Sequence, residues 1–274
     1  METLAVTILG SGTCVPSLRR SCCSVLVETG GAKLLFDMGA GTMRRLLEAG
    51  VAIDEITHLF FSHFHPDHTG ELVSFLFASK YPEGRRRQRG LTMTATGGFA
   101  VFYERLKDAY GRWIELEEGI IDIIEMSHVR EDCVQLECAD IFTLPMAHIE
   151  SSIGFRIVMP EGTSVVYTGD TDYCKNAVRL SMESDLLICE SALPDELKVD
   201  GHLTPSLAGK IATEAGVKNL ILTHFYPECE KVDVESQCRK TYSGSLLLAE
   251  DLMRLEIGGG SLTLIPQAPE ITGG

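Results

Sequence analysis

The chain has 274 residues, of which 45% are hydrophobic and 23% are charged, and its formal net charge is −15. This composition is typical of a globular protein and excludes a disordered chain or one embedded in a membrane. The acidic balance disfavours a large polyanion such as RNA as a partner, because proteins that bind nucleic acid usually present a basic surface.

The N-terminus and the cysteines bear on where the protein is located. The first residues, METLAVTILGSG, lack the basic start and the long apolar run of a signal peptide. No run approaches the roughly 18 apolar residues of a transmembrane helix. Nine cysteines without CxxC spacing favour reduced, mostly buried thiols over a disulfide framework. We therefore expect a cytoplasmic protein.

No linker or low-complexity stretch divides the chain, so we expect one domain over residues 1–274. In chain order, several short apolar runs end at polar side chains. They are HLFFSH ending at His63, SVVYTGD at Asp170, DLLICE at Glu190 and NLILTH at His224. Such runs predict buried strands that present reactive side chains at their carboxyl ends.

Helices are expected between these strands. In GTMRRLLEAG, Thr42 can cap a helix that Gly50 ends, and in HLTPSLAGKIATEAG, Thr204 precedes a helix that ends at Gly216. Further helices are predicted over residues 71–80, 99–110 and 243–255. Strands mixed with helices over this length predict a layered α/β fold, with an irregular tail after the last helix.

A tight loop, SHFHPDHTG, follows the first of these strands. Pro66 keeps the chain from simply continuing as a strand or a helix, and backbone alternation can direct His63 and His65 to one side and Asp67 and His68 to the other. Such side chains are costly to desolvate unless they bind a cation. The alternative is a polar surface loop, which the density of metal-binding residue types disfavours.

Other histidines extend this pattern. His148 and His224 follow apolar stretches, and His202 precedes a helix. His58 and His128 have no counterpart in the pattern, and we interpret them as structural. Because histidine and carboxylate serve zinc, manganese and iron alike, the residue types leave the identity of the metal open.

The order HxHxDH, His148, Asp170 and His224 resembles the metallo-β-lactamase superfamily, whose fold is a four-layered αββα sandwich with a two-metal site at one edge. Six segments are similar to the ribonuclease Z branch, from about residue 4 to residue 225. They are LGSGTCVPSLRR, FDMGAGTMRRL, PMAHIESSIGFRI, YTGDT, GHLTP and GVKNLILTH. This resemblance implies an αββα fold and a metal-dependent hydrolase.

The resemblance also implies which side chains bind the metals. Two divalent ions, most simply zinc, would lie about 3.5–4 Å apart and share an activated hydroxide that attacks phosphorus. Asp67 would additionally orient this hydroxide. Considered singly, Asp170 could be a turn residue and His224 a strand-end histidine. The first ion would be held by His63, His65 and His148, the second by Asp67, His68 and His224, with Asp170 bridging both.

The GHLTP segment favours phosphodiester chemistry over other hydrolase chemistry. In the ribonuclease Z branch, a histidine followed two residues later by Ser or Thr lies at the scissile phosphate, and an upstream glutamate orients it. The matching residues here are His202, Thr204 and Glu190. An imidazolium paired with a carboxylate can protonate an alkoxide. The alternatives are a helix-entry histidine and a surface glutamate, and Ser151 and Ser152 are best explained as a turn.

Two departures from that branch bear on the substrate. Residues 149–169 leave room only for a hairpin where many bacterial members carry a long arm that grips tRNA. The segment FYPECEK after His224 lacks the arginine expected near phosphate. The arginines of GRRRQRG, residues 84–90, are interpreted as a solvated loop rather than a phosphate site. We therefore predict a phosphodiesterase that acts on a small or cyclic phosphodiester.

Other functions are open at this point. A tRNA 3′-processing endonuclease is the main alternative, followed by an ester, thioester, lactone or sulfate hydrolase of the same fold. A metal-free scaffold is a further alternative, although none of the expected ligands is missing. A homodimer is an expectation from the resemblance alone.

Overall fold

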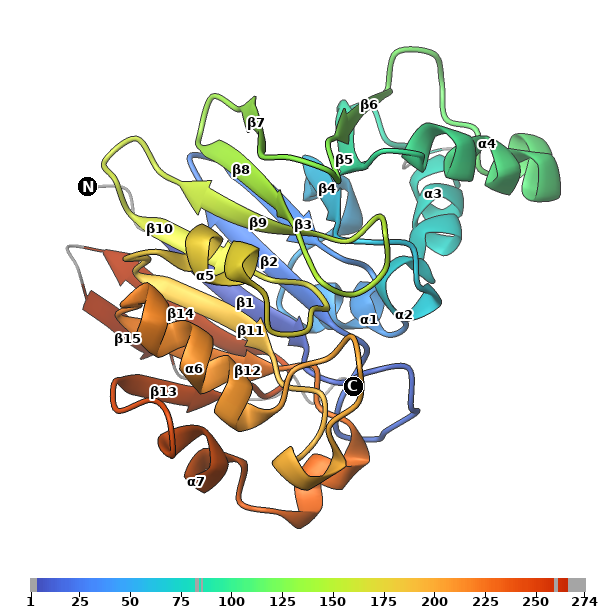
Figure 1. The fold of residues 1–274 in the computed structure, drawn as a ribbon. Coiled ribbons are helices and arrows are strands. Elements are labelled where there is room, and N and C mark those ends of the chain that lie inside the picture. Colours follow the sequence, from blue (N-terminus) through green and yellow to red (C-terminus); the bar gives the residue numbers. More distant parts are fainter. Residues whose placement is uncertain (1–3, 82–83, 85, 259–260, 266–274) are drawn as a thin grey trace.

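The computed structural model describes residues 4–81, 84, 86–258 and 261–265. Two β-sheets pack face to face, and helices cover their outer faces (Figure 1). In spatial order, the first sheet contains β15 (Ser261–Ile265), β14 (Met253–Gly258), β1 (Leu4–Gly10), β2 (Ser24–Thr29), β3 (Ala32–Phe36), β4 (His58–Phe61), β5 (Leu91–Thr96) and β6 (Ile121–Met126). The second contains β13 (Ser245–Leu248), β12 (Asn219–Thr223), β11 (Leu186–Glu190), β10 (Ser164–Tyr167), β9 (Ile153–Val158), β8 (Asp140–Pro145) and β7 (Asp132–Gln135).

Seven α-helices within the described residues complete the layers. They are α1 (Thr42–Glu48), α2 (Pro66–Thr69), α3 (Leu72–Lys80), α4 (Phe99–Tyr110), α5 (Lys175–Ser181), α6 (Pro205–Ala215) and α7 (Val234–Arg239). Helices α5 and α6 lie on the outer face of the second sheet, whereas α3 and α4 lie beside the first (Figure 1). None of the described helices is long and apolar enough to cross a membrane.

Apolar side chains form two clusters that hold the layers together. One lies between the sheets and beneath α5 and α6, and it includes Phe36 and Phe60 from the first sheet and Phe155 from the second. The other lies between the first sheet and α1, α3 and α4, and it includes Phe75 and Phe99. The result is the αββα sandwich that the sequence predicted.

Strand direction places the polar strand ends together. β4 runs parallel to β3 and β5, and β10, β11 and β12 run parallel to one another. Backbone hydrogen bonds join the sheets at their carboxyl edges, because the N–H of Ile153 donates to the carbonyl oxygen of Ser62 (3.0 Å) and that of Phe225 to Ser11 (2.9 Å). Residues that follow these strands therefore meet at one edge of the sandwich.

The helix predicted over residues 243–255 is wrong. β13 pairs parallel with β12, and β14 pairs antiparallel with β1. The apolar run SLLLAEDLMRL is compatible with a helix as well as a strand, because short apolar runs do not distinguish the two. The segment forms strands because the edges of β12 and β1 offer backbone N–H and C=O groups with which it can form hydrogen bonds. The expected irregular tail includes β15, and residues 266–274 lie outside the described residues.

The other predicted helices are confirmed, with one correction at the start of α1, whereas α2 lies in the segment that was predicted to be a loop. Thr42 is the first residue of α1, and Gly41, at a φ of 98°, is its cap. Pro66 does not prevent a helix but opens α2, because the first helical position needs no N–H. Thr204 precedes α6, and Gly216, at a φ of 65°, ends it.

The arginine-rich loop at residues 84–90 is solvated only in part. Arg87 is buried, and its guanidinium donates to the carbonyl oxygens of Ile53 (3.0 Å) and Ile56. Arg86 pairs with Glu117 at 3.6 Å, whereas Arg85 lies outside the described residues. A solvated loop is therefore wrong for Arg87, whose partners include backbone carbonyl oxygens 34 and 31 residues away in sequence.

Phe60→Ala is expected to lower the free energy of unfolding by about 3–5 kcal/mol, because it leaves a cavity between the sheets. The Phe60 ring stacks on Phe36 at 4.6 Å and meets Phe155 edge to face at 5.6 Å. Urea unfolding of both variants measures the effect, with the fully exposed Leu18 as control: Leu18→Ala should change stability by less than about 0.5 kcal/mol. Equal stability of the two variants would contradict this packing.

Candidate metal centre

The seven predicted ligands meet at the edge where the sheets join. Two lie in the turn after β4 and two in α2, while the others follow β8, β10 and β12. They are His63, His65, Asp67, His68, His148, Asp170 and His224.

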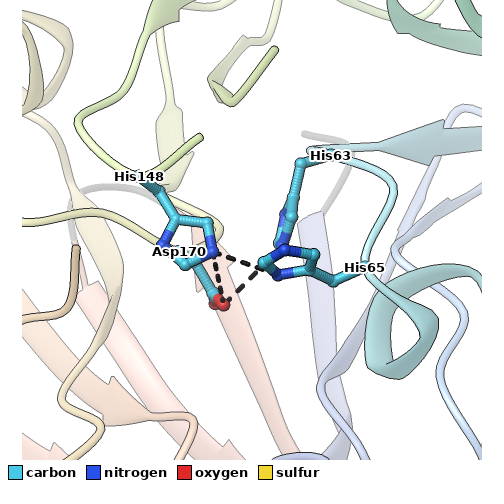
Figure 2. Close-up of side chains that lie close together, drawn as sticks. All are labelled: His63, His65, His148 and Asp170. Carbon is cyan, nitrogen blue, oxygen red and sulfur yellow. Dashed lines mark hydrogen bonds and ion pairs between the residues drawn. The ribbon is translucent and has the colours of Figure 1, made fainter. Parts of the chain in front are cut away.

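One group of side chains could hold a metal ion on the β4 side of the site. The ligand atoms of His63, His65, His148 and Asp170 all lie within 4.8 Å of one another (Figure 2). Asp170 Oδ2 lies 3.8 Å from His63 Nε2 and 3.7 Å from His148 Nε2. His148 Nε2 lies 3.1 Å from His65 Nδ1. The atoms converge on one point, as ligands of a single ion do.

A second group lies on the other side of Asp170. Ligand atoms of Asp67, His68 and His224 are also within 4.8 Å of one another. Asp170 Oδ1 lies 3.3 Å from His68 Nε2 and 3.3 Å from His224 Nε2. The two oxygens of Asp170 thus face different groups, which is the arrangement of a carboxylate shared by two sites.

Several of these atoms are buried without a hydrogen-bond partner. They include His63 Nε2, His68 Nε2, His224 Nε2 and Asp170 Oδ1. Each such buried polar atom costs about 1–3 kcal/mol if nothing satisfies it. One divalent cation in each group would together satisfy these four atoms, and imidazole with carboxylate suits zinc, manganese and iron. The residues present therefore fit the metals that the sequence predicts.

The protonation states on both sides suit cation binding. Burial lowers the pKa of His63 well below its usual value, so the ring is neutral. Burial alone would raise the pKa of Asp170, but the charges of His224 and His68 hold it well below its usual value. In the same way, burial alone would raise the pKa of Asp67, but the hydrogen bond from His224 and the charges of His68 and His224 together lower it to about 2. Ionised carboxylates and neutral imidazoles are the forms that bind metals.

His68 shows the opposite shift. Burial lowers its pKa, but the carboxylates of Asp170 and Asp37 outweigh burial and raise it well above its usual value. A proton on His68 thus carries the positive charge that the carboxylates require. Because the proton and a cation would occupy the same nitrogen, metal binding would displace the proton.

Asp37, which the sequence analysis did not assign to the site, supports the second group. Its Oδ2 accepts hydrogen bonds from His68 Nδ1 (2.7 Å), Tyr167 Oη (2.6 Å) and Ser62 Oγ (2.7 Å). The bond to Nδ1 directs Nε2 of His68 toward Asp170. Asp37 and His224 adopt φ angles of 55° and 61°, which non-glycine residues rarely do. Such strain of about 1–3 kcal/mol per residue persists where surrounding contacts impose it.

Close packing sets the position of the loop at residues 62–70. A Cβ on Gly39 would lie 1.9 Å from the carbonyl oxygen of Asp67, so only glycine allows this approach. On the other side of the site, His148 Nδ1 donates to the carbonyl oxygen of Gly201 at 2.8 Å. That bond leaves Nε2 of His148 facing Asp170.

The Glu190–His202 pair lies against both groups, and the ring centroids of His202 and His148 are 4.7 Å apart. His202 Nδ1 is 3.0 Å from Glu190 Oε1, and its ring stacks on His224 with centroids 5.6 Å apart. Glu190 also accepts the backbone N–H groups of Thr171 (2.6 Å), Leu203 (3.1 Å) and Ala192 (3.3 Å).

These contacts determine the charge of the pair. A carboxylate that accepts four N–H donors stays ionised even though burial raises the pKa of Glu190. Burial also lowers the pKa of His202, but the hydrogen bond to Glu190 and the charge of Glu190 more than offset this and raise it. The pair thus combines an anionic orienting group with a ring that retains its proton.

The remaining sequence-predicted residues lie around this edge or away from it. Thr204 is buried at the start of α6, with its hydroxyl 3.5 Å from Ser206 Oγ. Ser152 Oγ accepts the N–H of Ile149, as the turn interpretation predicts. His58 bonds Thr57 and belongs to neither metal group. His128 likewise belongs to neither group, and the described cysteines are free thiols.

Asp37→Ala is expected to lower the free energy of unfolding by about 3–5 kcal/mol, because it leaves the His68 ring and the Tyr167 hydroxyl buried without their acceptor. Tyr167→Phe removes one donor only and should cost about 1 kcal/mol. Urea unfolding of both variants at equal metal content measures which substitution lowers the free energy of unfolding more. A larger loss in Tyr167→Phe than in Asp37→Ala would contradict the central role of the Asp37 carboxylate.

Known proteins share this fold. A ribonuclease Z of Methanothermobacter thermautotrophicus is 26% identical over 93% of this chain and 97% of its own. The metallo-β-lactamase fold protein YhfI of Bacillus subtilis has a TM-score of 0.80 at 22% identity, over 93% of this chain and 100% of its own. A diphosphatase of the PhnP family has a TM-score of 0.67 at 20% identity, over 94% of this chain and 98% of its own.

The relatives and the two-sided cluster agree on the class of enzyme, a ribonuclease Z-like, metal-dependent hydrolase of the metallo-β-lactamase superfamily. The family model described as Anti-Pycsar protein Apyc1 matches residues 4–238, which is most of the chain. The chain belongs to the Anti-Pycsar protein Apyc1 family.

Proposed function

We propose that the protein is a phosphodiesterase that acts on a small or cyclic phosphodiester. The observation that carries this proposal is the Glu190–His202 pair at 3.0 Å, whose imidazole stacks on His224 of the metal cluster. A proton donor next to a cation site suits a reaction that expels an alkoxide from phosphorus. Hydrolysis of an activated ester, by contrast, needs no such donor.

We assign the cluster to two divalent ions, zinc in the first place, with manganese or iron as alternatives. When bound, the ions would supply a nucleophile at neutral pH and offset charge on the phosphoryl oxygens. Asp170 would be shared, since its oxygens face opposite groups. One ion would be held by His63, His65 and His148, and the other by Asp67, His68 and His224.

The chain's own side chains would orient the attack and supply a proton. Asp67, ionised and only partly exposed, would accept a hydrogen bond from the attacking water. Glu190 holds His202 through Nδ1, which leaves Nε2 to donate a proton to the departing oxygen. The proton leaves His202 as the P–O bond breaks, and the Glu190 carboxylate stabilises the imidazolium before this step.

Two features favour a small substrate over a tRNA. The segment between His148 and Asp170 forms only the β9–β10 hairpin, so no long arm projects from this part of the chain. The formal net charge of −15 also repels a polyanion at long range. A relative named ribonuclease Z keeps precursor tRNA as the second candidate substrate.

His202→Ala is expected to lower kcat for a cyclic nucleotide by about 10²–10⁴-fold, because the leaving alkoxide loses its proton donor. The loss should be much smaller for bis(p-nitrophenyl) phosphate, since p-nitrophenolate leaves without a proton. Steady-state kinetics on protein of known metal content measures both substrates. His58→Ala is the control, because His58 lies outside the cluster and should leave both rates unchanged.

Three outcomes would contradict the proposal. Unchanged turnover of cyclic nucleotides by His202→Ala would remove the proton-donor role. Cleavage of precursor tRNA at physiological salt without turnover of small diesters would favour the endonuclease. Turnover of lactones or thioesters alone would favour an ester hydrolase of the same fold.

A further inference from the structure

Asp172 lies two residues after Asp170, in the loop that follows β10, and belongs to neither metal group nor the Glu190–His202 pair. Its Oδ2 accepts Lys198 Nζ at 2.7 Å and the N–H of Gly201 at 3.2 Å. Its Oδ1 accepts the N–H of Tyr173 at 2.7 Å. Both carboxylate oxygens are therefore engaged, and one of them binds the loop between β11 and α6.

The backbone of Asp172 binds a different part of the site. Its N–H donates to the carbonyl oxygen of Ala147 at 2.8 Å, and the two residues form an isolated antiparallel bridge. Ala147 directly precedes His148 of the first metal group. Asp172 thus joins three segments: the loop after β10, the segment that carries His148, and the loop that carries His202.

Gly201 links Asp172 to both His148 and His202. Its carbonyl oxygen accepts His148 Nδ1 at 2.8 Å while its N–H donates to Asp172. His202 is the next residue along the chain. Gly201 has a φ of 84°, and a Cβ there would lie 3.1 Å from His148 Nδ1, so this close fit requires glycine. A shift of this one residue would move His202 and release His148 together.

We propose that Asp172 is a positioning residue that holds Gly201 and Lys198 so that His202 reaches the leaving oxygen of the substrate. This inference rests on the proposed function, because it requires a proton donor at His202. The inference goes further, because it assigns to the carboxylate of Asp172 the role of fixing the position of His202 relative to the first metal group.

A positioning role for Asp172 can be distinguished from a loss of folded protein, because the two change the rates for different leaving groups differently. Substrates with poor leaving groups need the proton from His202, whereas good leaving groups depart without it. A displaced His202 therefore slows the first kind much more than the second. Simple destabilisation would lower both rates by the same factor, since it reduces only the amount of active enzyme.

The test compares Asp172→Ala with the wild-type chain on substituted-phenyl phosphodiesters that range from good to poor leaving groups. At equal metal content, kcat for the poorest leaving group should fall by about 10²-fold or more, while that for the best should fall less than about threefold. KM should be unchanged for both. Lys198→Met keeps the carboxylate of Asp172 but removes one of its partners. In this variant, kcat should also depend more strongly on the leaving group than in the wild-type chain, but less strongly than in Asp172→Ala.

Asp185→Ala is the matched control. Asp185 also pairs with a lysine, Lys218 at 2.7 Å, and accepts a backbone N–H, that of Ser164 at 2.8 Å, but it is outside the metal groups. Loss of the Asp185 carboxylate should leave the ratio of kcat for good leaving groups to kcat for poor leaving groups at the wild-type value.

A uniform fall across all leaving groups in Asp172→Ala, or no fall, would overturn the positioning role. If Asp172→Ala fails to fold, a wild-type ratio in Lys198→Met would overturn it instead. A wild-type chain that loads metal but hydrolyses none of the diesters would show that the proposed function itself has failed.

Discussion

A buried carboxylate between two sets of imidazoles is the interaction on which the rest of the site depends. Asp170 Oδ2 faces His63 and His148, and Oδ1 faces His68 and His224. Removing so many polar atoms from water is favourable only if positive charge is shared among them. In the αββα sandwich, β4, β10 and β12 end at one edge, so that side chains distant in sequence converge there.

Support for the site extends well beyond the ligands. Asp37 directs one imidazole through a single hydrogen bond and accepts two more from hydroxyl groups, and Gly201 directs another imidazole through its carbonyl oxygen. Both Asp37 and His224 have backbone angles that are rare for side chains with a Cβ. The packed sheets impose these conformations, so stability gained in the core holds a strained and highly polar edge in place.

Much of this centre was predictable, because its signals are local in sequence. An apolar run that ends in a reactive side chain marks His63, Asp170, Glu190 and His224 without knowledge of their partners. Asp37 ends a similar run, yet its role depends on His68 and Tyr167, which are 31 and 130 residues away. The position of Asp37 at a strand end is thus visible in the sequence, but sequence spacing contains no signal for its partners.

The same limit explains the errors in the predicted fold. Residues 243–255 are compatible with a helix, and only the free edges of β12 and β1 make them strands. Arg87 belongs to a charged run, but the carbonyl oxygens of Ile53 and Ile56 accept its guanidinium and help to explain its burial. In each case a distant backbone group overrides a local preference.

The most direct measurement is a crystal structure of protein purified without chelator, with anomalous scattering recorded at the absorption edge of the bound metal. The account predicts two anomalous peaks, each within coordination distance of a different oxygen of Asp170. A single peak, or peaks that do not contact Asp170, would contradict the shared carboxylate and with it the proposed centre.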